Sequence, residues 1–427
     1  MSTTEDALVQ RARFSIWLIA LIALVAAGAV WLAALRARDA DHSGGVHDAG
    51  PAASLAAPAL VRWGSGEAGL VWQPGSERGA LAYTSLEDDA SGSARTLLTN
   101  IAPLQWRAAP GAAAQLHLAW LEAGGRLRTA LVDSQHKLLR GPIDIGAARP
   151  DSFALVPGPD GGTEILWIDA FSGELLAAPI DAAGRPFPTP AALRTGVSQF
   201  AAAADRRGRL WIAAVTAAPT GAPVVEVMMR QGDGTSPSLV ARTPLGVPAT
   251  ALRGSLALGF DATTAYVAWT TAGSANPDRE TAHVLALNLE AREDSAPQAS
   301  VIQIPEWDPG DTQNAPRGSW LALRGNHGAA DLHGLAFTAG QQDTALAVTS
   351  RWTPVGWQPV IVRFRDGVAD AYWPIPAHLP HPPALALLAL DTSRWTAAWT
   401  GLFRAQPRLF LAHGSENGLG ASERASG

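Results

Sequence analysis

Histidine and carboxylate side chains are the groups in this sequence whose spacing could support metal chemistry. Two close histidine pairs occur, His327 with His333 and His378 with His381, and the second pair lies in the proline-rich stretch HLPHPP. Neither pair has the spacing of metal ligands on a regular helix or strand. Acidic clusters occur at 87–89 and at Glu306, Asp308 and Asp311, where carboxylates could hold calcium. We interpret these clusters as solvated loops, and we expect no metal site.

Other chemistry-bearing motifs are missing from the sequence. It contains no glycine-rich nucleotide loop, no zinc-binding helix motif and no nucleophile elbow. It also contains no cysteine, which excludes disulfides and thiolate metal sites. We therefore expect no cofactor, and no catalytic residue can be assigned from a motif.

A repeated unit is the dominant pattern of the chain. Its clearest copy runs from Phe153 to Ile180 and consists of three short apolar strands joined by tight turns at Pro159–Gly162 and Ser172–Gly173. The second strand of each unit carries an aromatic residue, and these residues recur at intervals of 44 to 68. They are Trp72, Trp120, Trp167, Trp211, Trp269, Phe337 and Trp399. Repeats of this period indicate a solenoid or propeller architecture.

The strands around each aromatic residue differ in character. First strands are small and apolar, as in FALV, QFAAAA, SLALGF, WLALRG and ALALLAL, and several end at a polar turn with an Asp or Asn. Third strands include GELLAAPID, LAVTSRW and RLFLAHG, and fourth strands include KLLRGPIDI and PVIVRF. An innermost strand near a central axis requires small residues, and a bulky second-strand ring can pack between neighbouring sheets.

These repeats resemble β-propellers. The resemblance implies an all-β, seven-bladed β-propeller over residues 59–415, although six or eight blades also fit the marks. A strand from residues 51–57 could complete the last blade and close the ring. The turn Asp169-Ala170-Phe171-Ser172-Gly173-Glu174 resembles the D-x-x-T-G-E/K turn of quinoprotein repeats. Ala177 stands where that family has a tryptophan, so the turn supports a propeller and not a quinone cofactor. The alternatives are a β-sandwich and two unrelated β domains.

Long connections suggest where a propeller of this kind would bind a partner. Loops between strands two and three and between successive blades share one face, and we assign to that face residues 217–223, 272–282, 305–318, 340–344 and 366–383. Loops of this length are uncommon unless they are functional or disordered. Mixed charges with Trp and Arg are typical of recognition surfaces. The candidate binding residues are Asp278, Arg279, Trp307, Asp308, Asp311, Arg317, Trp373 and His378. Alternatively, Trp307 and Trp373 anchor their own loops.

The N-terminal segment has the composition of a membrane anchor. Residues 14–35 contain no charge, and about 20 apolar residues suffice to cross a bilayer as a helix. We predict a cytoplasmic tail at 1–13, a transmembrane signal-anchor helix at 14–36, a flexible linker at 37–58 and a disordered tail at 416–427. A cleaved signal peptide is the alternative. Arginines flank the span two to two, and we favour an inner-membrane protein with its large domain in the periplasm.

Charge excludes one class of partner. The formal charge of −6 divides into +2 over residues 1–38 and −8 over the rest. Such a domain lacks the clustered positive charge that binding to a phosphate backbone needs, so nucleic acid is not expected.

Two functions from different classes fit these features. One is a membrane-anchored scaffold that binds protein partners through the face with the long connections rather than through the axis. The other is a propeller hydrolase or lyase that acts on a glycan with carboxylates such as Asp308 and Asp311. A propeller hosts both classes. Convergent carboxylates and arginines at the axis would favour an enzyme, whereas an alanine-lined channel would not.

Overall fold

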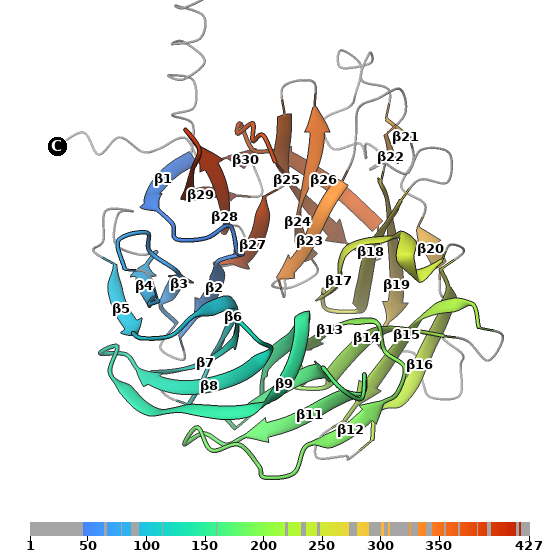
Figure 1. Cartoon of the computed structure of the whole chain (residues 1–427). Helices are drawn as coiled ribbons and strands as arrows, with labels where there is room; N and C mark the ends of the chain where they lie inside the picture. The colour runs from blue at the N-terminus through green and yellow to red at the C-terminus, as the bar shows by residue number, and fades with distance from the viewer. Residues whose placement is uncertain are drawn as a thin grey trace, which may run out of the picture. The chain divides into compact units, whose positions relative to one another are not determined.

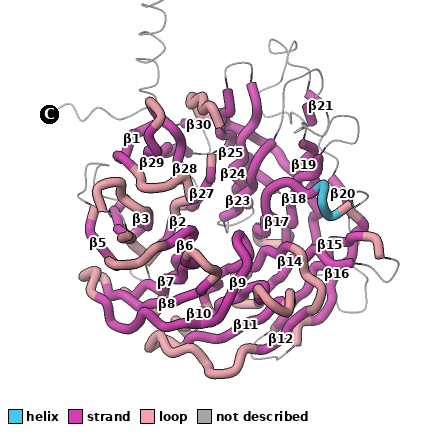
Figure 2. Tube along the Cα trace, in the orientation of Figure 1, coloured by secondary structure: helices cyan, strands magenta, loops and turns pink. Residues whose placement is uncertain are grey.

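The computed structural model describes one compact unit, Val46–Gly420, which contains nearly all of the repeats. Its described residues are 46–419, without 64–65, 78, 87–93, 113, 159, 218–220, 232–235, 246–247, 273–279, 290–299, 303–305, 308–323, 326–331, 339–343, 354–355, 366–367, 382, 391–393 and 416–417. Among these residues almost every element is a β-strand, and one short 3-10 helix, η1 (Ala249–Ala251), is the exception (Figure 2).

The strands form four-stranded antiparallel units, which we call blades and number in chain order. Blade 1 consists of β2 (Ala59–Arg62), β3 (Ala68–Trp72), β4 (Leu81–Ser85) and β5 (Arg95–Leu98). Blade 2 consists of β6 (Pro103–Pro110), β7 (Gln115–Glu122), β8 (Arg126–Asp133) and the first half of β9 (Leu138–Pro157). Blade 3 consists of the second half of β9, β10 (Thr163–Asp169), β11 (Leu175–Ile180) and β12 (Ala191–Arg194).

The remaining blades follow the same order from the innermost strand outward. Blade 4 consists of β13 (Gln199–Ala204), β14 (Leu210–Ala217), β15 (Pro223–Arg230) and β16 (Ser238–Pro244). Blade 5 consists of β17 (Leu252–Phe260), β18 (Thr264–Ala272), β19 (Glu280–Asn288) and β20 (Ser300–Ile302). Blade 6 consists of β23 (Leu332–Thr338), β24 (Thr344–Thr353), β25 (Gly356–Arg365) and β26 (Val368–Pro374). Between blades 5 and 6, β21 (Glu306–Trp307) pairs in parallel with β22 (Arg324–Gly325).

Blade 7 is completed by the N-terminal strand of the unit. It consists of β27 (Ala384–Ala389), β28 (Arg394–Phe403) and β29 (Gln406–Ser415), and the outer edge of β29 pairs with β1 (Val46–Pro51) and with β30 (Gly418–Leu419). The expectation that an N-terminal strand completes this blade is confirmed, but the strand is 46–51 rather than 51–57. The same strand corrects the predicted linker, because residues 46–51 of the segment 37–58 are paired in a sheet.

The blades are arranged in a closed ring, which gives a propeller-like fold (Figure 1). The innermost strands contact one another in the cyclic order β2, β6, β9, β13, β17, β23, β27 and back to β2. Each junction between successive blades holds its own cluster of buried apolar residues, including the junction between blades 7 and 1. Alanine-rich inner strands such as β13 permit this close approach at the centre.

Aspartates at the ends of several strands hold the tight turns. Asp205 is buried after β13, where its Oδ1 accepts hydrogen bonds from the backbone amides of Arg207 and Arg209, and its Oδ2 accepts one from the Trp211 indole. Asp261 after β17 does the same for Thr263 and Thr264. Carboxylates that bond to amides two or more residues ahead favour turns over strand continuation.

The repeated tryptophans lie on second strands as expected, but they do not all pack against the same neighbouring blade. Trp120, Trp167 and Trp399 pack in the cluster that each blade shares with the preceding blade. Trp211 packs instead against blade 5, the following blade, where its ring lies 6.1 Å from Phe260. It pairs with Ala203 near the start of its strand, whereas Trp167 lies near the end of β10, so the two are not equivalent.

Blade 6 departs from the predicted strand order by one strand. Phe337 was expected on a second strand, but it lies on β23, the innermost strand. The segments LAVTSRW and PVIVRF therefore form the second and third strands, not the third and fourth. The 340–344 connection joins strands one and two, and β26 occupies much of the predicted loop 366–383.

The predicted membrane span, residues 14–36, lies outside the described residues. None of the helical structure in the described part of the chain is long and apolar enough to cross a membrane.

Candidate functional site: an axial cavity

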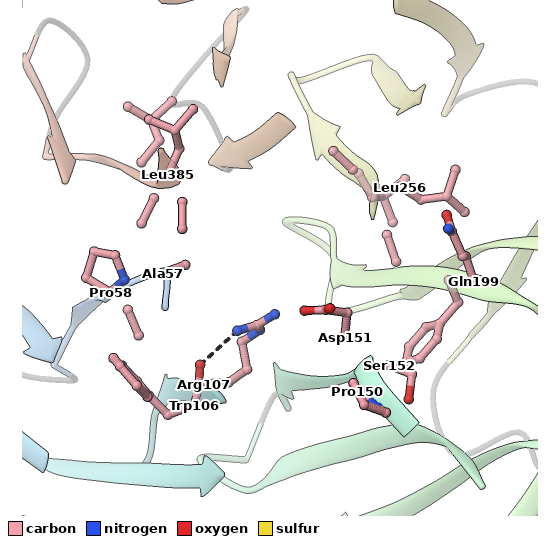
Figure 3. A pocket seen from close by; sticks show the side chains of 18 of the residues that line it. Ala57, Pro58, Trp106, Arg107, Pro150, Asp151, Ser152, Gln199, Leu256 and Leu385 are labelled. Atoms are coloured by element: carbon pink, nitrogen blue, oxygen red, sulfur yellow. Dashed lines mark hydrogen bonds between the residues drawn. The ribbon is translucent and has the colours of Figure 1, made fainter. Parts of the chain in front are cut away.

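A cavity of about 870 Å³ lies at the centre of the ring (Figure 3). Its described lining comes from the innermost strands β2, β6, β9, β13, β17 and β27 and from the residues that lead into them. The lining residues of β2, β13 and β27 and of the blade 3 part of β9 lie near the start of these inner strands, where the chain arrives from the preceding blade, whereas those of β6 and β17 lie near or beyond the middle. The cavity therefore lies toward the face that carries the blade-to-blade connections. Cavities of about 300–1,000 Å³ commonly hold small ligands.

Arg107 supplies a cationic group to the cavity. It lies on β6, the residue as a whole is half-buried, and its Cζ lies 5.2 Å from the centre of the Phe153 ring. Nη1 donates one hydrogen bond to the Trp106 carbonyl at 2.8 Å. A guanidinium has five N–H donors, so most of those of Arg107 stay available for a ligand. Burial lowers the pKa of the Arg107 guanidinium, and the nearby Asp151 carboxylate raises it.

Asp151 supplies the opposite charge. It lies on β9 at a positive φ of 54°, which few residues other than Gly, Asn and Asp adopt. Gln105 on β6 holds it in place, because the Gln105 amide donates to Asp151 Oδ1 and its carbonyl accepts the Asp151 backbone N–H at 3.0 Å. This pair of bonds leaves Oδ2 available. Figure 3 shows the carboxylate and the Arg107 guanidinium facing each other.

The rest of the lining is mainly small and aliphatic. It includes the half-buried Leu60, Ala201 and Leu385, whereas the rings of Trp106 and Phe200 are buried. Arg149 is an exposed cation close to Asp151 in sequence, and Gln199 adds an amide. Among the described lining residues, the ionisable groups are two arginines and one aspartate.

The structure describes few of the sequence-predicted binding residues. Asp278, Arg279, Asp308, Asp311 and Arg317 lie outside the described residues, and Trp307 is described only as part of β21. Trp373 lies on the outer strand β26, where it packs against the cluster between blades 6 and 7, with the Arg363 guanidinium 5.7 Å from its ring centre. This placement supports the alternative in which Trp373 anchors its own segment. His378 is exposed between β26 and β27.

Arg107 and Asp151 were not selected from the sequence. The sequence held one signal, because Arg107 places a charge in the stretch QWRAAP, and inner strands are expected to carry small, apolar residues. Asp151 follows Pro150 within the long strand that joins two blades. No sequence pattern, however, shows that residues from blades 2 and 3 face one cavity.

Comparison with known proteins supports the fold. No family model and no curated protein sequence matches the chain. Its structure is similar to the BP39L lectin from Burkholderia pseudomallei, with a TM-score of 0.53 and 14% identity, over 88% of this chain and 99% of that chain. At this identity the similarity shows the fold alone.

Two further solved structures are less similar. An ulvan lyase, a polysaccharide lyase, gives a TM-score of 0.49 and 10% identity over 88% of this chain and 95% of that chain. Hydrazine synthase of Kuenenia stuttgartiensis gives 0.40 and 12%, and the match covers 55% of this chain and 65% of that chain.

Proposed function

We propose that this chain is a non-catalytic, seven-bladed binding propeller that recognises a partner through its axial cavity. The observation that carries the proposal is the arrangement of Arg107 and Asp151, which face each other in the cavity with unused donors and an unused acceptor. Polar groups that line a cavity provide orientation and specificity for a ligand.

Arginines and a carboxylate converge at the axis, which is the feature expected of an enzyme, but a single carboxylate favours binding over paired-acid hydrolysis. Paired-acid glycoside hydrolysis uses two carboxylates about 5–9.5 Å apart. Among the described lining residues Asp151 is the one carboxylate, and Gln105 already bonds to it. The alternative of a glycan hydrolase or lyase stays a prediction, which assays for depolymerisation of neutral and acidic polysaccharides would test.

In the cell, we place this module at a membrane. The apolar segment 14–36 would anchor it, with the propeller in the periplasm as a subunit of a membrane-associated protein assembly. The support is the uncharged 22-residue stretch and the absence of clustered positive charge elsewhere. Protease added to spheroplasts would digest the propeller in this orientation, and protection until lysis would reverse it.

A cavity-filling substitution tests the role of the axis. Ala386 on β27 lines the cavity, while its neighbours Leu385 and Leu387 pack in the cluster between blades 6 and 7. Strand alternation therefore places Ala386 on the other face of the blade 7 sheet, as it does its pairing partner Ala398, which packs in the cluster between blades 7 and 1. Ala386→Phe should fill the cavity and leave the cluster between blades 6 and 7 undisturbed, and the melting temperature checks that the junction with blade 1 stays packed.

The experiment compares the tagged full chain purified in detergent as wild type, as Ala386→Phe and as Ala183→Phe, a control at an exposed turn. Partners that co-purify with the wild type and the control should be lost from Ala386→Phe, with the melting temperature unchanged. Retention of every partner by a folded Ala386→Phe protein would overturn the proposal.

A further inference from the structure

The charge and the walls of the axial cavity together indicate what kind of group it takes. The chain beyond residue 38 carries a net charge of −8, yet the described ionisable groups of the cavity lining sum to +1. This local reversal of sign favours an anionic ligand at the axis of an acidic protein. Among such anions, carboxylates and phosphates both match the planar donor fork of an arginine, and the singly charged carboxylate is repelled less by the neighbouring Asp151.

The Asp151 carboxylate narrows the class of anionic ligand. Asp151 keeps Oδ2 as an acceptor in the same cavity, held by Gln105 in a fixed backbone conformation. A ligand that satisfies both groups needs a carboxylate with a hydrogen-bond donor close to it. The C-terminal residue of a peptide has this pattern, since its backbone N–H is attached to the carbon that bears the carboxylate.

The apolar walls distinguish a peptide end from an acidic sugar. Sugars stack their apolar faces on exposed aromatic rings, but Trp106 and Phe200 are buried in the wall, and Trp106 donates its indole N–H to the Val71 carbonyl. The part of the described wall that is not buried instead includes alanine and leucine side chains such as Leu60, Ala201 and Leu385. These suit a small aliphatic side chain next to the carboxylate.

We propose that the axial cavity captures the C-terminal carboxylate of a partner protein with a small aliphatic last residue. The Arg107 guanidinium binds the carboxylate, and Asp151 Oδ2 accepts the N–H of the last residue. The apolar wall contacts the aliphatic side chain. This inference rests on the proposed function, because it specifies what the partner places in the same cavity.

Matched peptides test this assignment on the full chain in detergent. Isothermal titration would compare N-acetyl-Ala-Ala-Val as the free acid, as the C-terminal amide and as the depsipeptide in which an ester oxygen replaces the last N–H. The amide should bind at least tenfold more weakly, since it loses a charged hydrogen bond to Arg107. The depsipeptide should bind several-fold more weakly, because it offers Asp151 no donor.

Two arginine variants show whether the effect belongs to the cavity. Arg107→Gln should remove the preference for acid over amide. Arg128→Gln, which alters an arginine of the same blade that is paired with Asp144 and Glu122 away from the cavity, should keep it. An acid preference that survives in folded Arg107→Gln would overturn the assignment, and so would equal binding of acid and amide by the wild type.

Glucuronate and the Ala386→Phe variant separate failure of this inference from failure of the proposed function. If glucuronate binds and the peptide acid does not, and if Ala386→Phe abolishes glucuronate binding, the peptide assignment is overturned. The cavity then remains the binding site. Peptide binding that is unaffected by Ala386→Phe would overturn both.

Discussion

Two junctions of the ring join neighbouring blades through different chain connections. Between blades 2 and 3, the single strand β9 serves as the outer strand of one sheet and the inner strand of the next. Between blades 7 and 1, the chain must return after one full circuit, and β1 pairs with β29 across the two ends of the unit. The first junction is covalent, while the second depends on contacts between residues more than 300 positions apart.

The apolar packing of the two junctions is similar. Trp167 is fully buried in the cluster between blades 2 and 3, and Trp72 is buried with Leu409 and Leu411 in the cluster between blades 7 and 1. Both junctions also carry hydrogen bonds between blades. Gln105 bonds to Asp151 between blades 2 and 3, whereas at the closing junction Arg62 donates to the Ala389 and Leu390 carbonyls and Thr400 Oγ1 to the Ala56 carbonyl. Packing and polar contacts are thus common to both junctions, and the closing junction differs in having no covalent link.

The largest expected effect follows from the shared packing. Trp167→Ala and Trp72→Ala should each lower the free energy of unfolding by about 3–5 kcal/mol, because each leaves a large cavity between two blades. Thermal or denaturant unfolding would measure the loss. Phe171→Ala is the control, since that ring is 88% exposed at a turn of blade 3. A loss at one junction without the other would show that the packing is not equivalent.

An intermediate effect should be confined to the closing junction. Arg62→Met keeps the aliphatic stem but removes the donor that blade 1 extends to the carbonyls at the end of β27. Hydrogen bonds from charged groups contribute about 1.5–3 kcal/mol, and the half-buried position of Arg62 favours the lower end. Denaturant unfolding would be compared with that of Arg126→Met, an exposed arginine at the start of β8. Equal stability of the two variants would show that Arg62 does not contribute to closure.

Much of the ring could be predicted from the sequence, because its signal is local. The alternation of small and apolar residues identified the strands of blades 3, 4 and 7, and the turn from Asp169 to Glu174 has the expected geometry, with Asp169 Oδ1 accepting the Phe171 and Ser172 amides. The predicted strand order of blade 6 was wrong for the same reason, namely that the signal is local. Its strands β24 and β25 are ten residues each and strongly apolar, so a local pattern cannot tell which of four strands a segment forms.

The candidate site could not be predicted, because it depends on contacts between blades. Gln105 and Asp151 are 46 residues apart and meet only because the inner strands of blades 2 and 3 lie side by side. The long loops led us to predict a binding site on the connections between strands. Loop length gives no information about which side chains of the inner strands face the axis. The orientation of an inner strand is a property of the closed ring, which no single repeat contains.

The smallest expected effect compares one histidine at each junction, a buried one between blades 2 and 3 and a half-buried one at the closing junction. His117 is fully buried on β7, with Nε2 3.3 Å from the Gly161 carbonyl of blade 3. His413 on β29 bonds through Nδ1 to Thr396 Oγ1 at 2.8 Å, and its ring centre lies 5.9 Å from that of His47 on the closing strand. Burial lowers the pKa of both imidazoles, and His47 lowers that of His413 further. The Gly161 carbonyl and Asp181 act in the opposite direction on the pKa of His117.

A lowered pKa in the folded state means that the unfolded chain binds the proton more tightly. Both histidines therefore contribute stability that is complete well above the ordinary histidine pKa of about 6.5 and that falls as the pH drops through this value toward the lower folded pKa. The wild-type melting temperature should decrease between pH 7.5 and 5.5. His117→Gln and His413→Asn keep a polar atom near the partner but remove the titration, so each should show a smaller decrease, with the exposed His381→Asn as the control for substitution. If only His413→Asn reduces the pH dependence, acid acts through the closing junction, where the proton adds charge beside His47. If neither does, the stability of both junctions is independent of these protons, and the acid response comes from other titrating groups.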